Sequence, residues 1–130
     1  MNPPALAIIA APPDSLRYSL RALLARLPQI AEVRAVEDTD ALLMILAELQ
    51  PRLIVLDVNL LRAEAGPVLK QVQATAARAR LVVLVDHIDQ LHALQTAPAD
   101  LVLLKGYPAA DLFARLEQLL THSAHDSDQR

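Results

Sequence analysis

Five short apolar runs, separated by segments with helical periodicity, constrain the fold of this 130-residue chain more than any other feature. A short continuous run of branched apolar residues is typical of a strand that is buried on both faces. Parallel strands need crossover connections, and a right-handed crossover places a helix between two strands. The alternation therefore predicts an α/β fold, with a doubly wound parallel sheet that carries helices on both faces.

The predicted strands are 5–10, Glu32–Val36, 53–56, 81–85 and Leu101–Leu104. The first two predicted helices lie between Asp14 and Pro28, and between Asp38 or Thr39 and Pro51. The remaining predicted helices are 68–78, 87–95 and 111–120. Polar and apolar residues alternate in Glu32–Val36, which favours an edge strand with one exposed face. The side chains of Asp14, and of either Asp38 or Thr39, are expected to cap the helices that follow them.

Composition excludes several classes of function. Twelve Lys and Arg residues against 15 Asp and Glu residues give a net charge of −3 without a basic stripe, which argues against direct binding of nucleic acid or an anionic membrane. The absence of cysteine excludes disulfides and cysteine-ligated metal sites, and the four histidines, His87, His92, His122 and His125, lack the spacing of a zinc site. No run is long enough to span a membrane and no signal peptide is indicated, so we expect a cytoplasmic protein.

Polar residues stand at the ends of three predicted strands. Asp57 follows 53–56, Asp86 follows 81–85, and Lys105 follows Leu101–Leu104. The carboxyl ends of parallel strands meet at one edge of a sheet, where ligand sites of open α/β folds lie. We therefore expect these three side chains to converge.

Two motifs carry a family resemblance. LIVLDVNLL around Asp57 and LVLLKGYP around Lys105 resemble the strongest signatures of the response-regulator receiver family. LRYSLRALLARLP is similar to the first helix of receivers attached to helix-turn-helix transcription factors, and PADLVLLK resembles the approach to the fifth strand. The resemblance covers residues 5–120. It implies a flavodoxin-like sheet with strand order 2-1-3-4-5 and five helices, a phosphoacceptor at Asp57, and a lysine at 105 that pairs with the phosphoryl group.

We expect one receiver-like domain over residues 1–121, followed by a polar tail, or the start of a linker to an output domain, over residues 122–130. The resemblance also suggests that the faces around the first, fourth and fifth helices contact a partner or form a homodimer. The segments 87–95 and 111–120 belong to these faces.

The metal ligands of the family are the first departure from its pattern. Receivers hold Mg²⁺ with an acidic pair after the first strand, but Ala11 and Pro12 stand at these positions and neither can bind a cation. The remaining candidates are Asp57, the backbone carbonyl of Asn59, and Asp14 as a speculative substitute. Mg²⁺ is therefore a possible cofactor, although the simpler expectation is that no cofactor is bound.

The switch residues of the family are the second departure. Val85 stands where receivers have a threonine or serine whose hydroxyl moves toward the phosphoryl group, and Val102 stands where they have an aromatic residue. Neither valine can donate a hydrogen bond. The usual relay between the phosphate and the surface is therefore expected to be absent.

Several residues also have simpler structural interpretations. Asp14 is more often a helix cap at such a position, and Asp86 a loop carboxylate, although either could substitute as a metal ligand. Lys105 either pairs with a phosphoryl group or serves as a salt-bridge partner that keeps a buried Asp57 ionised. The residues alone leave these alternatives open.

Two hypotheses of function follow. The first is a degenerate receiver, or pseudo-receiver, of a two-component system that acts through protein contacts. The second is a response regulator whose Asp57 is phosphorylated by a histidine kinase in an Mg²⁺-dependent reaction, either alone or as the receiver part of a transcription factor. At most, we expect the chain to catalyse its own phosphorylation and dephosphorylation at Asp57.

Overall fold

The computed structural model describes residues 5–61 and 65–128, with side chains described through residue 121. The strands are β1 (Leu6–Ala10), β2 (Glu32–Val36), β3 (Leu53–Asp57), β4 (Arg80–Val85) and β5 (Leu101–Leu104). The helices are α1 (Ser15–Ala25), α2 (Thr39–Glu48), α3 (Ala65–Thr75), α4 (Ile88–Ala93) and α5 (Ala109–Asp128), with a short 3-10 turn, η1 (Val58–Leu60), after β3. All strand pairs are parallel and the order is β2-β1-β3-β4-β5, so the predicted fold class and strand order are confirmed.

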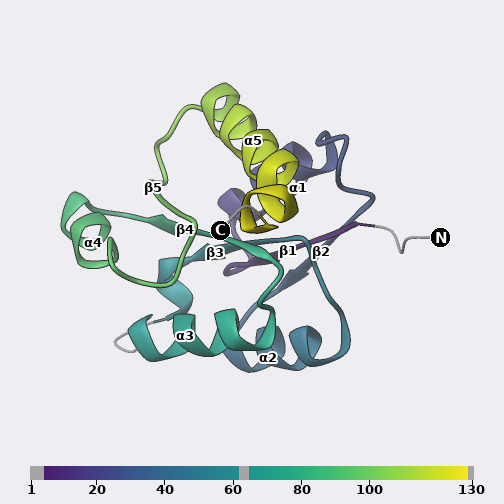
Figure 1. The fold of residues 1–130 in the computed structure, drawn as a ribbon. Helices are drawn as coiled ribbons and strands as arrows, with labels where there is room; N and C mark the ends of the chain where they lie inside the picture. Colours follow the sequence, from purple (N-terminus) through teal and green to yellow (C-terminus); the bar gives the residue numbers. More distant parts are fainter. Residues whose placement is uncertain (1–4, 62–64, 129–130) are drawn as a thin grey trace.

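The sheet separates two helical layers. Figure 1 shows α1 and α5 on one face of the sheet and α2 and α3 on the other. β1, β3 and β4 lie inside the sheet, and almost all of their residues are buried, as their continuous apolar runs predict. β2 lies at an edge and alternates in exposure, as expected for a strand with one solvent-facing side.

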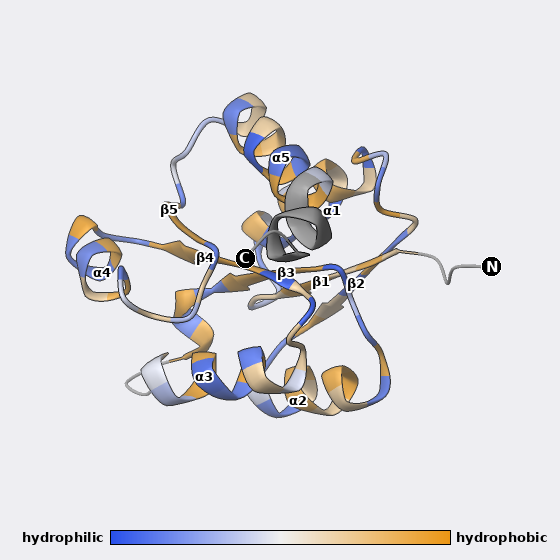
Figure 2. Cartoon of the chain, in the orientation of Figure 1, coloured by the Kyte–Doolittle hydropathy of each residue, from blue (hydrophilic) through white to orange (hydrophobic). Residues whose placement is uncertain are grey.

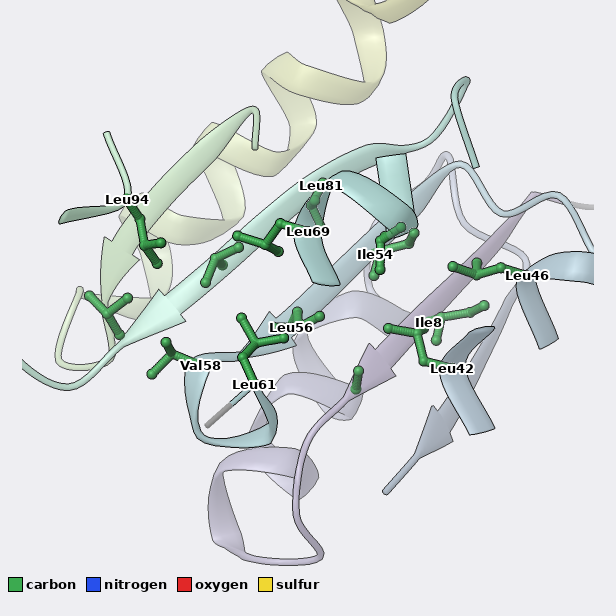
Figure 3. Close-up of a cluster of buried hydrophobic side chains, with 14 of the residues drawn as sticks. Ile8, Leu42, Leu46, Ile54, Leu56, Val58, Leu61, Leu69, Leu81 and Leu94 are labelled. Carbon is green, nitrogen blue, oxygen red and sulfur yellow. The ribbon is translucent and has the colours of Figure 1, made fainter. Parts of the chain in front are cut away.

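Each face of the sheet has its own apolar core. In β1, Ile8 packs in the core beneath α2 and α3, whereas Ile9 packs in the core beneath α1 and α5, because successive side chains of a strand point to opposite faces. Figure 3 shows Ile8 in the first of these cores, near Leu42 and Leu46 of α2. Figure 2 shows apolar residues along the strands and a mixture of polar and apolar residues on the helices. The helices therefore bury one side each.

Aspartates cap the first two helices. Asp14 Oδ1 accepts hydrogen bonds from the backbone N–H groups of Leu16 at 3.1 Å and Arg17 at 3.4 Å. Asp38 Oδ1 accepts from Ala41 N at 2.7 Å, so Asp38 rather than Thr39 caps α2. These bonds satisfy N–H groups that have no partner inside the helix.

The later helices differ from their predicted bounds. α3 begins three residues earlier than predicted, because proline is well suited to the first turn of a helix and Pro67 therefore lies inside α3 rather than before it. The helix also ends three residues earlier, at Thr75. α4 is shorter than 87–95 because Leu94 already leaves the helical conformation. α5 runs past residue 120 to Asp128, since the sequence offers no proline or glycine to stop it. Most of the predicted tail is thus a continuation of α5. Within the described part of the chain, no helix is long and apolar enough to cross a membrane.

Candidate functional site

The candidate site lies at the carboxyl end of the sheet, where three neighbouring strands end. Asp57 is the last residue of β3, and Asp86 and Lys105 directly follow β4 and β5. The strand register pairs Asp57 with Leu84, and the Lys105 N–H donates to the carbonyl of Val85 at 2.9 Å. Backbone pairing thus brings the three strand ends side by side.

Lys105 bridges the two carboxylates. Its Nζ lies 2.8 Å from Asp57 Oδ1 and 2.9 Å from Asp86 Oδ1. The side chain of Asp57 is only 1% exposed, against 21% for Lys105 and 31% for Asp86. A buried carboxylate is costly unless an opposite charge pairs with it. The predicted convergence is confirmed, and Lys105 supplies the counter-charge of Asp57. We call these residues the Asp57–Lys105–Asp86 triad.

Asn59 closes the triad into a ring. Its backbone N–H donates to Asp57 Oδ1 at 2.9 Å, which also caps η1. Its side chain lies near Asp86 and helps to lower the pKa of that carboxyl group. Asp57, Lys105, Asp86 and Asn59 therefore each lie beside two others of the four.

The triad shifts the pKa of two of its members. The hydrogen bond from Lys105 lowers the pKa of Asp86 below its ordinary 3.8, although desolvation acts in the opposite direction. Partial burial alone would lower the pKa of Lys105, but its hydrogen bonds to Asp57 and Asp86 and their negative charges outweigh burial and raise that pKa above 10.5. The carboxylate of Asp86 and the ammonium of Lys105 therefore both stay charged around neutral pH.

One oxygen of the buried carboxylate has no protein partner. Asp57 Oδ1 accepts from Lys105 and Asn59, whereas Asp57 Oδ2 is buried and has no hydrogen-bond partner among the described residues. An unpaired buried acceptor typically costs about 1–3 kcal/mol. Asp57 Oδ2 is therefore the atom of the triad with spare capacity to bind a cation, a water or a phosphoryl group.

The end of β1 offers no acidic ligand for a cation. Ala11 is fully buried in the core beneath α1 and α5, its N–H donates to Val36 O at 3.1 Å, and Pro12 follows it. Asp14 is exposed and its Oδ1 accepts two backbone N–H groups of α1. Within residues 5–61 and 65–121, no three His, Cys, Asp or Glu side chains are grouped to hold a metal ion. The acidic pair that the family resemblance implies is therefore missing after β1, and metal binding by Asp57, Asn59 and Asp14 stays a prediction.

The switch positions are apolar packing positions. Val85 is fully buried in the core beneath α2 and α3, and the half-buried Val102 packs against the same core. Neither carries a group that could hydrogen-bond a ligand at Asp57. His87 and His92 are exposed, and the side chains of His122 and His125 lie outside the described residues.

Sequence reasoning did not predict that Asp86 is the second partner of Lys105, nor that Gln90 fixes the backbone beside it. Gln90 Oε1 accepts from the N–H groups of Asp86 at 2.8 Å and His87 at 3.0 Å. The signal for this contact was available, because glutamine at the third position of a helix often accepts from the backbone at its start.

Comparison with solved structures identifies the fold. A receiver domain of an HD-domain protein from Pseudomonas fluorescens Pf-5 aligns with a TM-score of 0.81 at 18% identity, covering 100% of this chain and 96% of that one. A CheY-like receiver domain from Methanospirillum hungatei JF-1 aligns with a TM-score of 0.80 at 14% identity, covering 95% and 99%. The fold is that of a response-regulator receiver domain. A LuxR-family response regulator from Aurantimonas sp. SI85-9A1 shares this receiver fold, with a TM-score of 0.75 at 20% identity and coverage of 97% and 94%. No protein-family model and no curated protein matches the chain.

Proposed function

We propose that this chain is a cytoplasmic pseudo-receiver of a two-component system, which signals through protein contacts and not through efficient Mg²⁺-dependent phosphorylation. The carrying observation is that the buried Ala11 stands directly after β1, where an acid would be needed to hold a cation. Lys105 Nζ lies 2.8 Å from Asp57 and serves as its counter-charge, and the chain offers few ligands for a cation.

The chemistry of phosphoryl transfer supports this proposal. Transfer to a carboxylate depends mainly on positioning and on cations that stabilise the charge developing on the phosphoryl oxygens. Asp57 is suitably placed to accept a phosphoryl group, because it ends a central strand beside Lys105. Without acids after β1, the main electrostatic contribution to the reaction is missing, so we expect phosphorylation to be slow.

Exposed apolar side chains support a role in protein contacts. Tyr18 of α1 is 70% exposed and Ile88, the first residue of α4, is 51% exposed. These residues lie on two of the helices whose faces we expect to meet a partner or a second copy of the chain. Phe113 of α5 is only partly exposed, because it packs against the core and the Arg26 guanidinium lies 5.6 Å from its ring centre. We therefore place the partner surface on α1 and α4 before α5.

A second candidate is a working response regulator that a histidine kinase phosphorylates on Asp57. The observation that favours it is the buried Asp57 Oδ2, an acceptor without a partner in the described part of the chain. The similarity of the fold to the LuxR-family response regulator is compatible with a receiver that belongs to a longer transcription factor.

A titration followed by backbone amide shifts separates the two candidates. The protein is titrated with Mg²⁺ and then with beryllofluoride, a mimic of an acyl phosphate, with Asp57→Asn as the control. We expect no saturable shifts around Asp57 at millimolar Mg²⁺. Saturable shifts that disappear in Asp57→Asn would overturn the proposal and favour the response regulator.

A further inference from the structure

Asp86 is a second anion at the site, and contacts with Lys105 and Gln90 fix its position. Lys105 Nζ lies 2.9 Å from its Oδ1. The Asp86 N–H also donates to Gln90 Oε1 at 2.8 Å, which ties the residue to α4. Asp86 is therefore held beside the lysine that serves Asp57.

The contacts of Lys105 leave it little capacity for a further anion. A lysine ammonium has three N–H donors, and two carboxylates lie within hydrogen-bond distance of this one. With Asp57 and Asp86 ionised, the triad carries a net charge of −1. An anion that approaches Asp57 meets the negative charge of Asp86 and an ammonium already shared between two partners.

We infer that Asp86 is a positioning residue that holds Lys105 between two carboxylates and thereby weakens the binding of a phosphoryl-like anion at Asp57. This inference rests on the receiver-like site of the proposed function and names the residue that regulates it. An anion at Asp57 must compete with Asp86 for Lys105. Val85, the residue before Asp86, offers no hydroxyl that could assist the incoming anion.

The test compares three forms of the full chain by beryllofluoride titration at a fixed Mg²⁺ concentration, read from backbone amide shifts. Asp86→Asn removes the charge with little change of shape. Asp89→Asn, on the exposed side of α4, is the matched control because it removes the same charge nearby. We expect Asp86→Asn to show saturable beryllofluoride binding at concentrations at least about tenfold lower than any at which the unaltered protein responds, and Asp89→Asn to behave like the unaltered protein. Adding Asp57→Asn to Asp86→Asn should abolish the binding.

Denaturant unfolding of the same proteins separates positioning from a merely structural role. A structural role would shift the unfolding midpoint of Asp86→Asn while leaving its beryllofluoride affinity equal to that of the unaltered protein, and this result overturns the inference. The absence of binding in both forms also overturns it, because removal of Asp86 would not have opened the site. Weaker binding by Asp86→Asn overturns it as well, and would indicate that Asp86 is a cation ligand.

The two proposals fail in different ways in this experiment. Saturable binding of beryllofluoride by the unaltered protein contradicts the pseudo-receiver proposal, whatever Asp86→Asn does. The inference about Asp86 depends on the comparison of the two forms: saturable binding by Asp86→Asn alone, or tighter binding by Asp86→Asn than by the unaltered protein, supports it, so either proposal can fail while the other stands.

Discussion

Lys105 Nζ lies 2.8 Å from Asp57 Oδ1 and so joins the residue after β5 to a buried carboxylate at the end of β3. The two strands are not neighbours, because β4 lies between them. This contact therefore spans the carboxyl edge of the sheet. It gives Asp57 a counter-charge from within the protein.

Lys105→Met should destabilise the protein, because it leaves Asp57 buried without its counter-charge. Breaking a buried ion pair by removing one partner typically costs about 3–5 kcal/mol, and the partial exposure of Lys105 reduces this to an expected loss of at least about 1 kcal/mol. The free energy of unfolding from urea denaturation measures the loss. Lys70→Met, at an exposed position of α3, is the matched control and should change stability little. Equal midpoints for the two variants would show that the Asp57–Lys105 contact contributes nothing.

Stability should fall at both extremes of pH. The folded-state pKa of Asp86 lies below 3.8, so its contribution is present above that value and is lost as the pH falls through the folded-state pKa. The folded-state pKa of Lys105 lies above 10.5, so its contribution is present below that value and is lost as the pH rises through the folded-state pKa. Melting temperatures across this range measure both effects.

Asp86→Asn isolates the loss of stability that is expected at acidic pH. Its melting temperature should lie below that of the unaltered protein at neutral pH, and the difference should shrink as the pH falls from about 3.8 through the lower folded-state pKa of Asp86. A difference that stays constant down to the lowest pH would contradict the predicted role of its charge.

Ala11→Asp should be strongly destabilising, because residue 11 is fully buried in the core beneath α1 and α5. A buried carboxylate without a designed partner costs several kcal/mol, or it remains protonated. Pro12→Asp, at the adjacent and partly exposed position, is the control and should cost less. The measurement is urea denaturation near neutral pH. Similar stability of Ala11→Asp and the unaltered protein would show that the end of β1 accepts an acid.

Asp14→Ala tests whether Asp14 is a helix cap or a metal ligand. As a cap that accepts from Leu16 and Arg17, it should contribute about 1 kcal/mol to stability, and its removal should leave any response to Mg²⁺ unchanged. Urea denaturation measures the change in stability, and a Mg²⁺ titration followed by amide shifts measures the change in metal response. A loss of Mg²⁺-dependent amide shifts in Asp14→Ala would contradict the assignment as a cap.

The strands could be predicted closely because continuous apolar runs, and the alternation of polar and apolar residues in β2, are plain signals in the sequence. β2 and β5 have the predicted bounds, and β3 differs only by including Asp57. Helix ends were harder to predict, since they depend on local backbone choices. Pro67 lies in the first turn of α3 where it was expected to precede the helix, and α5 continues past residue 120.

The positions of the site residues were predictable, but their partners were not. Asp57, Asp86 and Lys105 had to meet because parallel strands end at one edge of the sheet. The direction of the Asp86 side chain depends on the loop after β4, which Gln90 holds through hydrogen bonds from the N–H groups of Asp86 and His87. The sharing of Lys105 between two carboxylates therefore required the structure.

Phosphorylation by a small-molecule donor tests the central claim most directly. The full chain is incubated with acetyl phosphate and Mg²⁺, beside Asp57→Asn, and the intact mass of each protein is measured. The account predicts that both proteins keep their original mass, because the end of β1 supplies no acid for the cation. The gain of one phosphoryl group by the unaltered protein, absent from Asp57→Asn, would contradict it.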